Sequence, residues 1–111
     1  MKEIKTIIQP FVADQVLAAL REMSGLPGVT VSEVKGFGRA LGHATSQEEA
    51  EIFGVKNMKL EIVLPDNLVD DVVQLIVKHA HTGNPGDGKI FISTVDDVVK
   101  IRTGEHETEA L

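Results

Sequence analysis

Two spacings of apolar residues alternate along this chain, and their order limits the folds that it can adopt. Alternation at every second position predicts four strands, at residues 2–9, 29–37, 57–65 and 89–94. Spacings of three and four residues predict two helices, over about 16–23 with Asp14 as its cap and over 68–80 with Asp66 as its cap. Residues 98–103 resemble a short continuation of the last strand. This order predicts an α+β fold of the ferredoxin-like βαββαβ type, an antiparallel sheet with two helices on one face.

The chain is short for such a sheet to bury both of its faces. Its 111 residues predict a single domain, 1–111, and only 4% of them are aromatic. Ile, Val and Leu nevertheless supply both sides of several strands. We therefore expect subunit assembly to cover the sheet face that the helices leave open.

Composition excludes several classes of function. A net charge of -6 and the scarcity of aromatic residues disfavour a nucleic-acid partner. The absence of cysteine excludes disulfides and thiolate metal sites. No apolar run has the length of a membrane helix or a signal peptide, so we expect a cytoplasmic protein that is not itself embedded in a membrane. No nucleophile is paired with a base, so we expect no enzyme.

Three segments fit neither spacing. Residues 38–56 show no clean apolar face, which predicts a long loop of the kind that often carries function. Residues 83–88 hold three glycines and a proline and predict a tight loop before the last strand. Residues 104–111 form a tail with three glutamates and no Lys or Arg, which we expect to be solvated.

Basic residues stand beside the glycine-rich segments. The motifs GFGR (36–39), GDGK (86–89) and KIRTGE (100–105) supply Arg39, Lys89, Lys100 and Arg102. Cations beside glycine turns in an acidic protein suggest a di- or triphosphate ligand. The segment 83–89 is not a P-loop, because Ile90 follows where Ser or Thr holds Mg²⁺ and because a strand, not a helix, comes next.

These motifs resemble those of the PII signal-transduction proteins. The resemblance rests on VTVSEVKGFGRALGH (29–43), LEIVLPD (60–66) and TGNPGDGKIFISTVDDVVKIRTGE (82–105), and it extends over nearly the whole chain. It implies a homotrimer with nucleotide sites between subunits, where ATP and ADP compete; AMP is a further candidate. It also implies that 38–56, the T-loop, signals to a membrane transporter or an enzyme of nitrogen or related metabolism. Residues 83–88 are then the B-loop.

The resemblance also implies the residues of the nucleotide site. One side of the site would be lined by Ile7, Thr30, Gly36, Phe37, Gly38 and Arg39. The adenine would meet Glu61 and Val63, and a neighbouring subunit would contribute Lys100 and Arg102. The B-loop and its flank would hold the phosphates through Gly86, Asp87, Gly88 and Lys89.

The chain departs from the family's pattern in the effector region. Ala40 replaces a Gln that helps to hold Mg²⁺ and 2-oxoglutarate, and Ala has no oxygen to offer a cation. The loop has no Tyr, which excludes the family's nucleotidylation of a T-loop tyrosine. The T-loop is also about two residues shorter than the family's pattern. The family has a basic residue just before the third strand that contacts phosphate, and here that residue is either Lys56 or absent. Gln9 stands where the family usually has a basic residue. Lys100 stands where the family usually has Arg.

Two alternatives stay open at this point. One is a PII-like sensor of another small anion, such as bicarbonate, or of a metal ion held with the help of His43. The second is a CutA-like trimer, which shares the fold and binds metal. His79 and His81 lie two apart on a helix and so point to different faces, which disfavours a shared metal ion.

Overall fold

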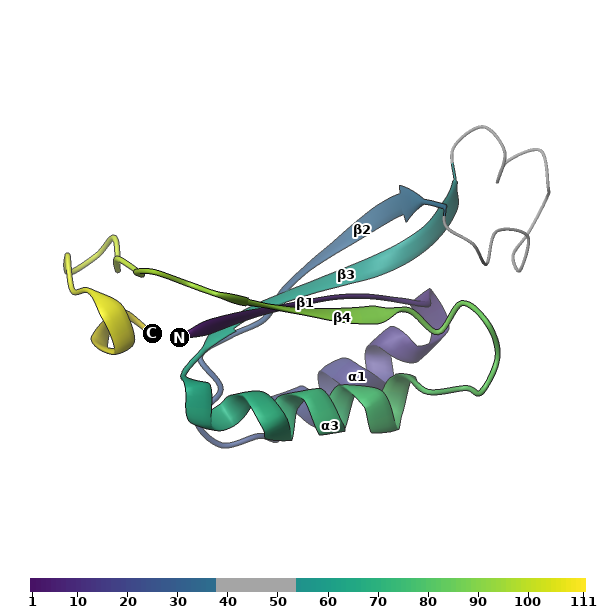
Figure 1. The fold of residues 1–111 in the computed structure, drawn as a ribbon, viewed down its shortest axis with the longest axis horizontal. Helices are drawn as coiled ribbons and strands as arrows, with labels where there is room; N and C mark the ends of the chain where they lie inside the picture. The colour runs from purple at the N-terminus through teal and green to yellow at the C-terminus, as the bar shows by residue number, and fades with distance from the viewer. Residues whose placement is uncertain (38–53) are drawn as a thin grey trace.

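The frame of the molecule is a four-stranded antiparallel sheet with the strand order β2-β3-β1-β4 (Figure 1). The computed structural model describes residues 1–37 and 54–111. The strands are β1 (Lys2–Ile8), β2 (Thr30–Gly36), β3 (Val55–Leu64) and β4 (Lys89–Thr94). The helices are α1 (Pro10–Arg21) and α3 (Val69–Ala80), with short 3₁₀ turns at η1 (Asp66–Leu68) and η2 (Glu107–Ala110). The predicted ferredoxin-like βαββαβ fold is confirmed.

Both helices lie on the same face of the sheet, as Figure 1 shows. The core between them is built from the predicted alternate positions of β1 and β3 and from one stripe of each helix. Its fully buried members are Ile4, Thr6, Ile8, Val12, Val16, Leu20, Leu60, Ile62, Leu64, Val72 and Ile76. The hydroxyl of Thr6, the one polar member, donates a 2.9 Å hydrogen bond to the carbonyl of Lys89.

The helix starts differ from the prediction. α1 begins at Pro10, with Gln9 at its N-cap, and Asp14 lies exposed inside it. Proline suits the first helical position because its missing N–H has no intrahelical partner there. Asp66 does not cap α3; it begins the preceding turn η1, and its carboxylate lies 2.9 Å from the Met1 ammonium. The hydrogen bond that the Met1 ammonium donates to Asp66, together with the ammonium charge, lowers the pKa of Asp66.

β3 begins at Val55, two residues before the predicted strand. Gly36 pairs with Val55 and Lys35 with Lys56, so the last two residues of the predicted loop 38–56 belong to the sheet. The Lys56 ammonium lies 2.8 Å from the Glu33 carboxylate across the two strands. Residues 38–53 of the predicted T-loop lie outside the described residues.

The prediction of a strand-like segment at 98–103 is wrong. Only one isolated bridge forms, between Val99 and His106, and residues 101–103 make a turn. The segment folds back on itself instead of pairing with the sheet, and Ala110 in η2 is buried. In the described parts of the chain, no helix combines the length and the apolar character needed to span a membrane.

Candidate functional site

Six of the predicted site residues share the sheet face that carries no helix, here called the open face. Side chains alternate along a strand, and Ile4, Thr6 and Ile8 point into the core, so Ile7 belongs to the opposite face. The cross-strand register carries this assignment to the neighbouring strands. The predicted residues on the open face are Ile7, Thr30, Gly36, Glu61, Val63 and Lys89.

The register also gives the neighbours of these residues. Ile7 stands between Lys59 of β3 and Lys89 of β4, and Thr30 stands opposite Glu61. The Lys59 ammonium lies 3.3 Å from the Glu61 carboxylate, and both side chains are about one-third exposed. The open face therefore brings apolar and charged side chains into adjacent positions.

The B-loop is shaped by the carboxylate of Asp87. One oxygen accepts from the amides of Thr82 at 2.8 Å and Gly83 at 3.1 Å, and the other accepts from the Thr82 hydroxyl. The Thr82 hydroxyl bond is the main cause that lowers the pKa of Asp87, and the Thr82 amide adds to it. Both carboxylate oxygens of Asp87 thus accept hydrogen bonds from donors of its own loop, and its predicted contact with phosphate stays a prediction.

Gly88 allows the B-loop to enter β4 against the backbone of β1. Its φ is +102°, and a Cβ at this position would lie 2.0 Å from the carbonyl oxygen of Ile7. Gln9 supports the same junction from the end of β1, because its side-chain amide donates a 2.8 Å hydrogen bond to the carbonyl of Gly86. Three predicted residues, Ile7, Gly88 and Lys89, are thereby brought into direct proximity.

The last described residues of β2 and the first before β3 also approach closely. A Cβ on Gly54, whose φ is +77°, would lie 2.6 Å from the carbonyl carbon and oxygen of Gly36. Phe37 is 76% exposed. The predicted residues Gly38, Arg39, Ala40 and His43 lie outside the described residues.

Lys100 and Arg102 lie at the other end of the sheet. β4 starts at the B-loop with Lys89 and ends at Thr94, and the chain continues away from that loop to the C-terminal segment (Figure 1). Five strand steps of about 3.3 Å already separate Lys89 from Thr94 by about 17 Å. Within one chain, Lys89 is therefore not brought together with Lys100 and Arg102.

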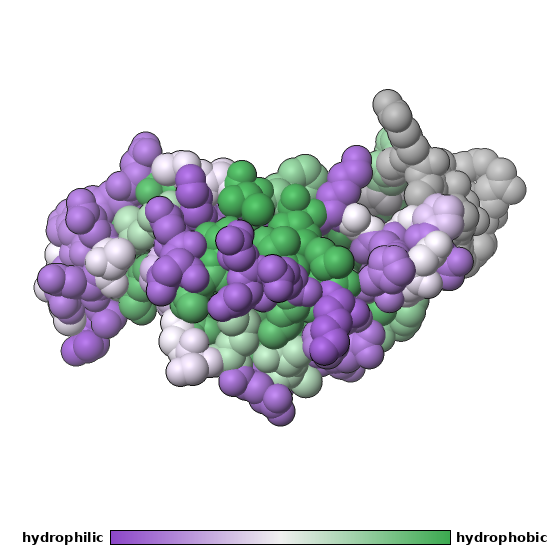
Figure 2. Space-filling view, turned by 60° about the horizontal axis from the view of Figure 1, so that its bottom comes forward, coloured by the Kyte–Doolittle hydropathy of each residue, from purple (hydrophilic) through white to green (hydrophobic). Residues whose placement is uncertain are grey.

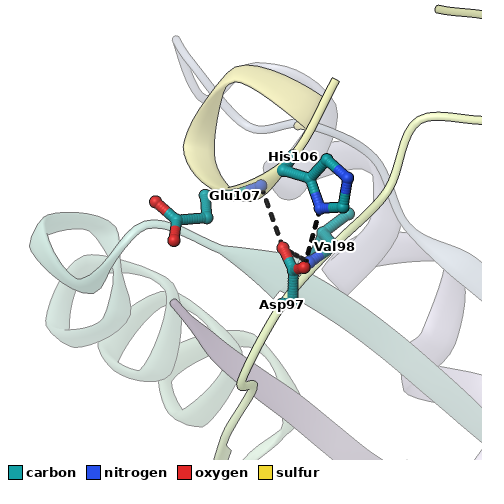
Figure 3. Close-up of polar contacts among 4 residues, drawn as sticks. All are labelled: Asp97, Val98, His106 and Glu107. Carbon is teal, nitrogen blue, oxygen red and sulfur yellow. Dashed lines mark hydrogen bonds and ion pairs between the residues drawn. The ribbon is translucent and has the colours of Figure 1, made fainter. Parts of the chain in front are cut away.

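The segment that carries Lys100 and Arg102 is a small hairpin. The Lys100 amide donates to the carbonyl of Glu105 at 2.9 Å, and the Gly104 amide donates to the carbonyl of Lys100 at 2.7 Å. At its base, Asp97 contacts both arms: Oδ2 lies 2.8 Å from Nδ1 of His106, and Oδ1 accepts from the Val98 and Glu107 amides (Figure 3). The hydrogen bond with His106 is the main cause that lowers the pKa of Asp97.

Comparison with known proteins identifies the family of this arrangement. The sequence profile of the family "Nitrogen regulatory protein P-II" matches residues 1–105. The chain belongs to the P-II family. It is 50% identical to a nitrogen regulatory protein P-II of Microchaete diplosiphon and 46% identical to that of Azospirillum brasilense. It is 48% identical to nitrogen regulatory protein P-II 1 of Escherichia coli K12, and all three alignments cover 100% of both chains.

Membership of the P-II family confirms the resemblance noted from the motifs. It places the chain among regulatory proteins, and it favours neither a CutA-like trimer nor a sensor of bicarbonate or metal. Within the described ranges 1–37 and 54–111, no three His, Asp or Glu side chains are grouped to hold a metal ion. The candidate metal ligand His43 lies outside these ranges.

Sequence reasoning did not find every residue that shapes the P-II site. Thr82 bonds to Asp87 in the B-loop, and Asp97 and His106 contact each other at the base of the C-terminal hairpin. Gln9 was named from the sequence only as the replacement of a basic residue, and its bond to the B-loop was not foreseen. The TGNPGD motif offered one usable signal, because a Thr followed five residues later by Asp can close a loop through its own side chains. The Asp97–His106 contact joins residues nine apart and had no comparable signal.

Proposed function

We propose that this P-II protein binds ATP or ADP in clefts between the subunits of a homotrimer. In this proposal, the bound nucleotide sets the state of the T-loop, which contacts a target transporter or enzyme in the cytoplasm. Nitrogen regulation is the role stated in the names of the relatives. AMP is a further candidate ligand. Magnesium is not part of the proposal, because Ala40 offers no ligand oxygen.

The observation that carries the proposal is the placement of the cations at opposite ends of one sheet. Lys89 lies beside the B-loop, whereas Lys100 and Arg102 lie in the C-terminal hairpin. A phosphate ligand that uses both groups must take one from each of two chains. Contacts that join unlike ends of a molecule close into rings when the rotation permits, and a trimer is such a ring.

The surface of the chain supports assembly. The open face carries apolar Ile7, Val34, Val55, Val63 and Phe91 among its charged residues. Figure 2, which is turned toward the helix side, shows a further apolar area near the centre of the molecule, crossed by hydrophilic side chains. Large exposed apolar areas commonly mark protein–protein contacts.

Calorimetry with ATP and ADP tests the ligand. Lys89→Ala is expected to weaken binding by about 1.5–3 kcal/mol, the usual range for a hydrogen bond to a charged group. Lys78→Ala is the matched control, because Lys78 is an exposed α3 lysine without an ion pair among the described residues. Absence of nucleotide heat in the unmodified protein, or equal affinities of the two variants, would refute the proposal.

Mixing two variants tests whether the site is shared. Lys89→Ala chains keep Arg102, and Arg102→Ala chains keep Lys89. In randomly mixed trimers, about one quarter of the shared sites unite both native residues and regain full affinity, because the ring contact is head-to-tail. If both residues served the same chain's site, mixing would restore none. Light scattering at about three times the 12.0 kDa chain mass checks the trimer itself.

Titration of the nucleotide-loaded protein tests the effector. With Ala40 in place, we expect 2-oxoglutarate with Mg-ATP to shift the T-loop by no more than about 1 kcal/mol. Bicarbonate and divalent metal ions serve as the comparison ligands in the same series. Tight, Mg-dependent binding of 2-oxoglutarate would show that another residue replaces the missing Gln.

A further inference from the structure

The contact between Asp97 and His106 lies at the base of the C-terminal hairpin, and neither residue is among those predicted to touch the nucleotide. Residues 98–106 are not part of the sheet, and their backbone is joined by a few hydrogen bonds and one isolated bridge. Lys100 and Arg102 lie in this hairpin, and Arg102 is in the turn at its tip. A weakly held hairpin positions charged side chains poorly unless something else fixes it.

Asp97 supplies the fixing contact. Its two carboxylate oxygens contact both arms of the hairpin: Val98 on the outgoing arm, and His106 and Glu107 on the returning arm (Figure 3). Glu107 has a φ of +56°, the one positive value among the described non-glycine residues. Its amide donates to Asp97 Oδ1 at 3.2 Å and to the carbonyl of Val98 at 2.9 Å, so the same contact holds a backbone conformation that L residues rarely adopt.

The chemistry of the pair sets its strength. Asp97 is ionised near neutral pH as an ordinary aspartate is, and the hydrogen bond with His106 lowers its pKa further. Nδ1 of His106 must then donate to the carboxylate, either as imidazolium or as the neutral Nδ1–H tautomer. The charged groups around the pair are Asp96 beside Asp97, Glu105 and Glu107 beside His106, and Lys100 opposite Glu105.

We propose that Asp97 and His106 are positioning residues of the nucleotide site, because their contact closes the hairpin that presents Lys100 and Arg102 to phosphate. The inference rests on the proposed function for its ligand. In this inference Asp97 and His106 act by fixing the hairpin, and neither residue touches the nucleotide.

The test compares Asp97→Asn with Asp96→Asn in the full-length protein, with ADP as the probe. Asp97→Asn keeps the size of the side chain and an acceptor oxygen, but it removes the charge. Asp96→Asn removes the same charge one residue away, where no hydrogen bond or ion pair is formed among the described residues. We expect Asp97→Asn and His106→Asn each to weaken ADP binding by about two- to five-fold, as for an exposed ion pair, and Asp96→Asn to leave it within error.

Two further measurements separate positioning from general stability. In the absence of nucleotide, hydrogen exchange at the Lys100, Gly104 and Glu107 amides is expected to accelerate in Asp97→Asn while the β1 amides remain unchanged. The double variant Asp97→Asn/His106→Asn is expected to be no weaker than either single variant, because both remove one contact.

The outcomes distinguish the inference from the function on which it rests. If wild type binds ADP and Arg102→Ala weakens it, but Asp97→Asn matches Asp96→Asn, the positioning role is wrong and the nucleotide site stands. If wild type binds no nucleotide, both proposals fail. Unchanged amide exchange in Asp97→Asn would also overturn the inference, since the hairpin would then be held without the pair.

Discussion

Replacing Gly88 with alanine tests how the B-loop is joined to the sheet. The φ of +102° disfavours any L side chain, and the added Cβ would lie 2.0 Å from the Ile7 carbonyl oxygen and 3.1 Å from the Ile7 carbonyl carbon. An ordinary contact begins near 3.4 Å, so the β1 and β4 backbones must separate by more than an ångström. The contact is with backbone, and no rotation of a side chain relieves it.

The expected cost follows from what such a separation breaks. The left-handed conformation costs an L residue about 1–2 kcal/mol. Separation at this point also disrupts the Ile7–Lys89 cross-strand pair and the hydrogen bond from the Thr6 hydroxyl to the Lys89 carbonyl, worth about 0.5–1.5 kcal/mol for each bond lost. Gly88→Ala should therefore lower the free energy of unfolding by about 3–5 kcal/mol, a large share of the stability of a small domain.

Gly83→Ala is the matched control in the same loop. Its φ is also positive, at +87°, but the added Cβ would meet only the His81 ring at 3.8 Å, an ordinary contact. Its expected cost is the conformational part alone, about 1–2 kcal/mol. Urea unfolding followed by circular dichroism, at one fixed protein concentration, measures both variants. A Gly88→Ala loss within about 0.5 kcal/mol of the control would refute the close-approach reasoning.

Three further predictions concern the core and the B-loop. Leu60→Ala, at a site with 0% exposure, should lower the free energy of unfolding by about 2–5 kcal/mol in urea; a loss below about 1 kcal/mol would mean that the site collapses to fill the cavity. Thr6→Val keeps the shape but removes the hydrogen bond to the Lys89 carbonyl, and should cost about 1 kcal/mol in the same assay, whereas no loss would show that the bond contributes nothing net. Asp87→Asn should destabilise at pH 7 and much less at pH 3. The pKa of Asp87 is lowered in the folded state, chiefly by the Thr82 hydroxyl. Its contribution to the free energy of unfolding is therefore present above the ordinary aspartate pKa and is lost as the pH falls through the lower folded value. An equal loss of stability at both pH values would contradict this.

The strands and the buried faces were predictable because their signal is local. The alternation that buries Ile4, Thr6 and Ile8 is written in the sequence, and so is the stripe that buries Val72 and Ile76. The same alternation placed the site residues of β1 and β3 on one face.

The errors fall where a distant or competing partner decides. Asp14 and Asp66 are good capping residues by type, yet Pro10 starts α1 and the Met1 ammonium takes the Asp66 carboxylate. Val55 and Lys56 joined β3 because β2 extends beside them, which no local pattern shows. The apparent strand at 98–103 was misassigned because the segment pairs with residues that follow it, through the Val99–His106 bridge, and not with the sheet. Residue types suggested a phosphate ligand, but only the fold showed that Lys89 lies apart from Lys100 and Arg102.

Because the B-loop and the C-terminal hairpin lie apart, ligand binding and subunit association are linked equilibria in the proposed function. A ligand held by Lys89 of one chain and Arg102 of another stabilises the complex of chains as well as occupying a site. Dilution of the protein then releases ligand, and saturation with ligand resists dissociation, by the same coupling free energy. An affinity measured for this protein is therefore defined only together with the protein concentration at which it was obtained.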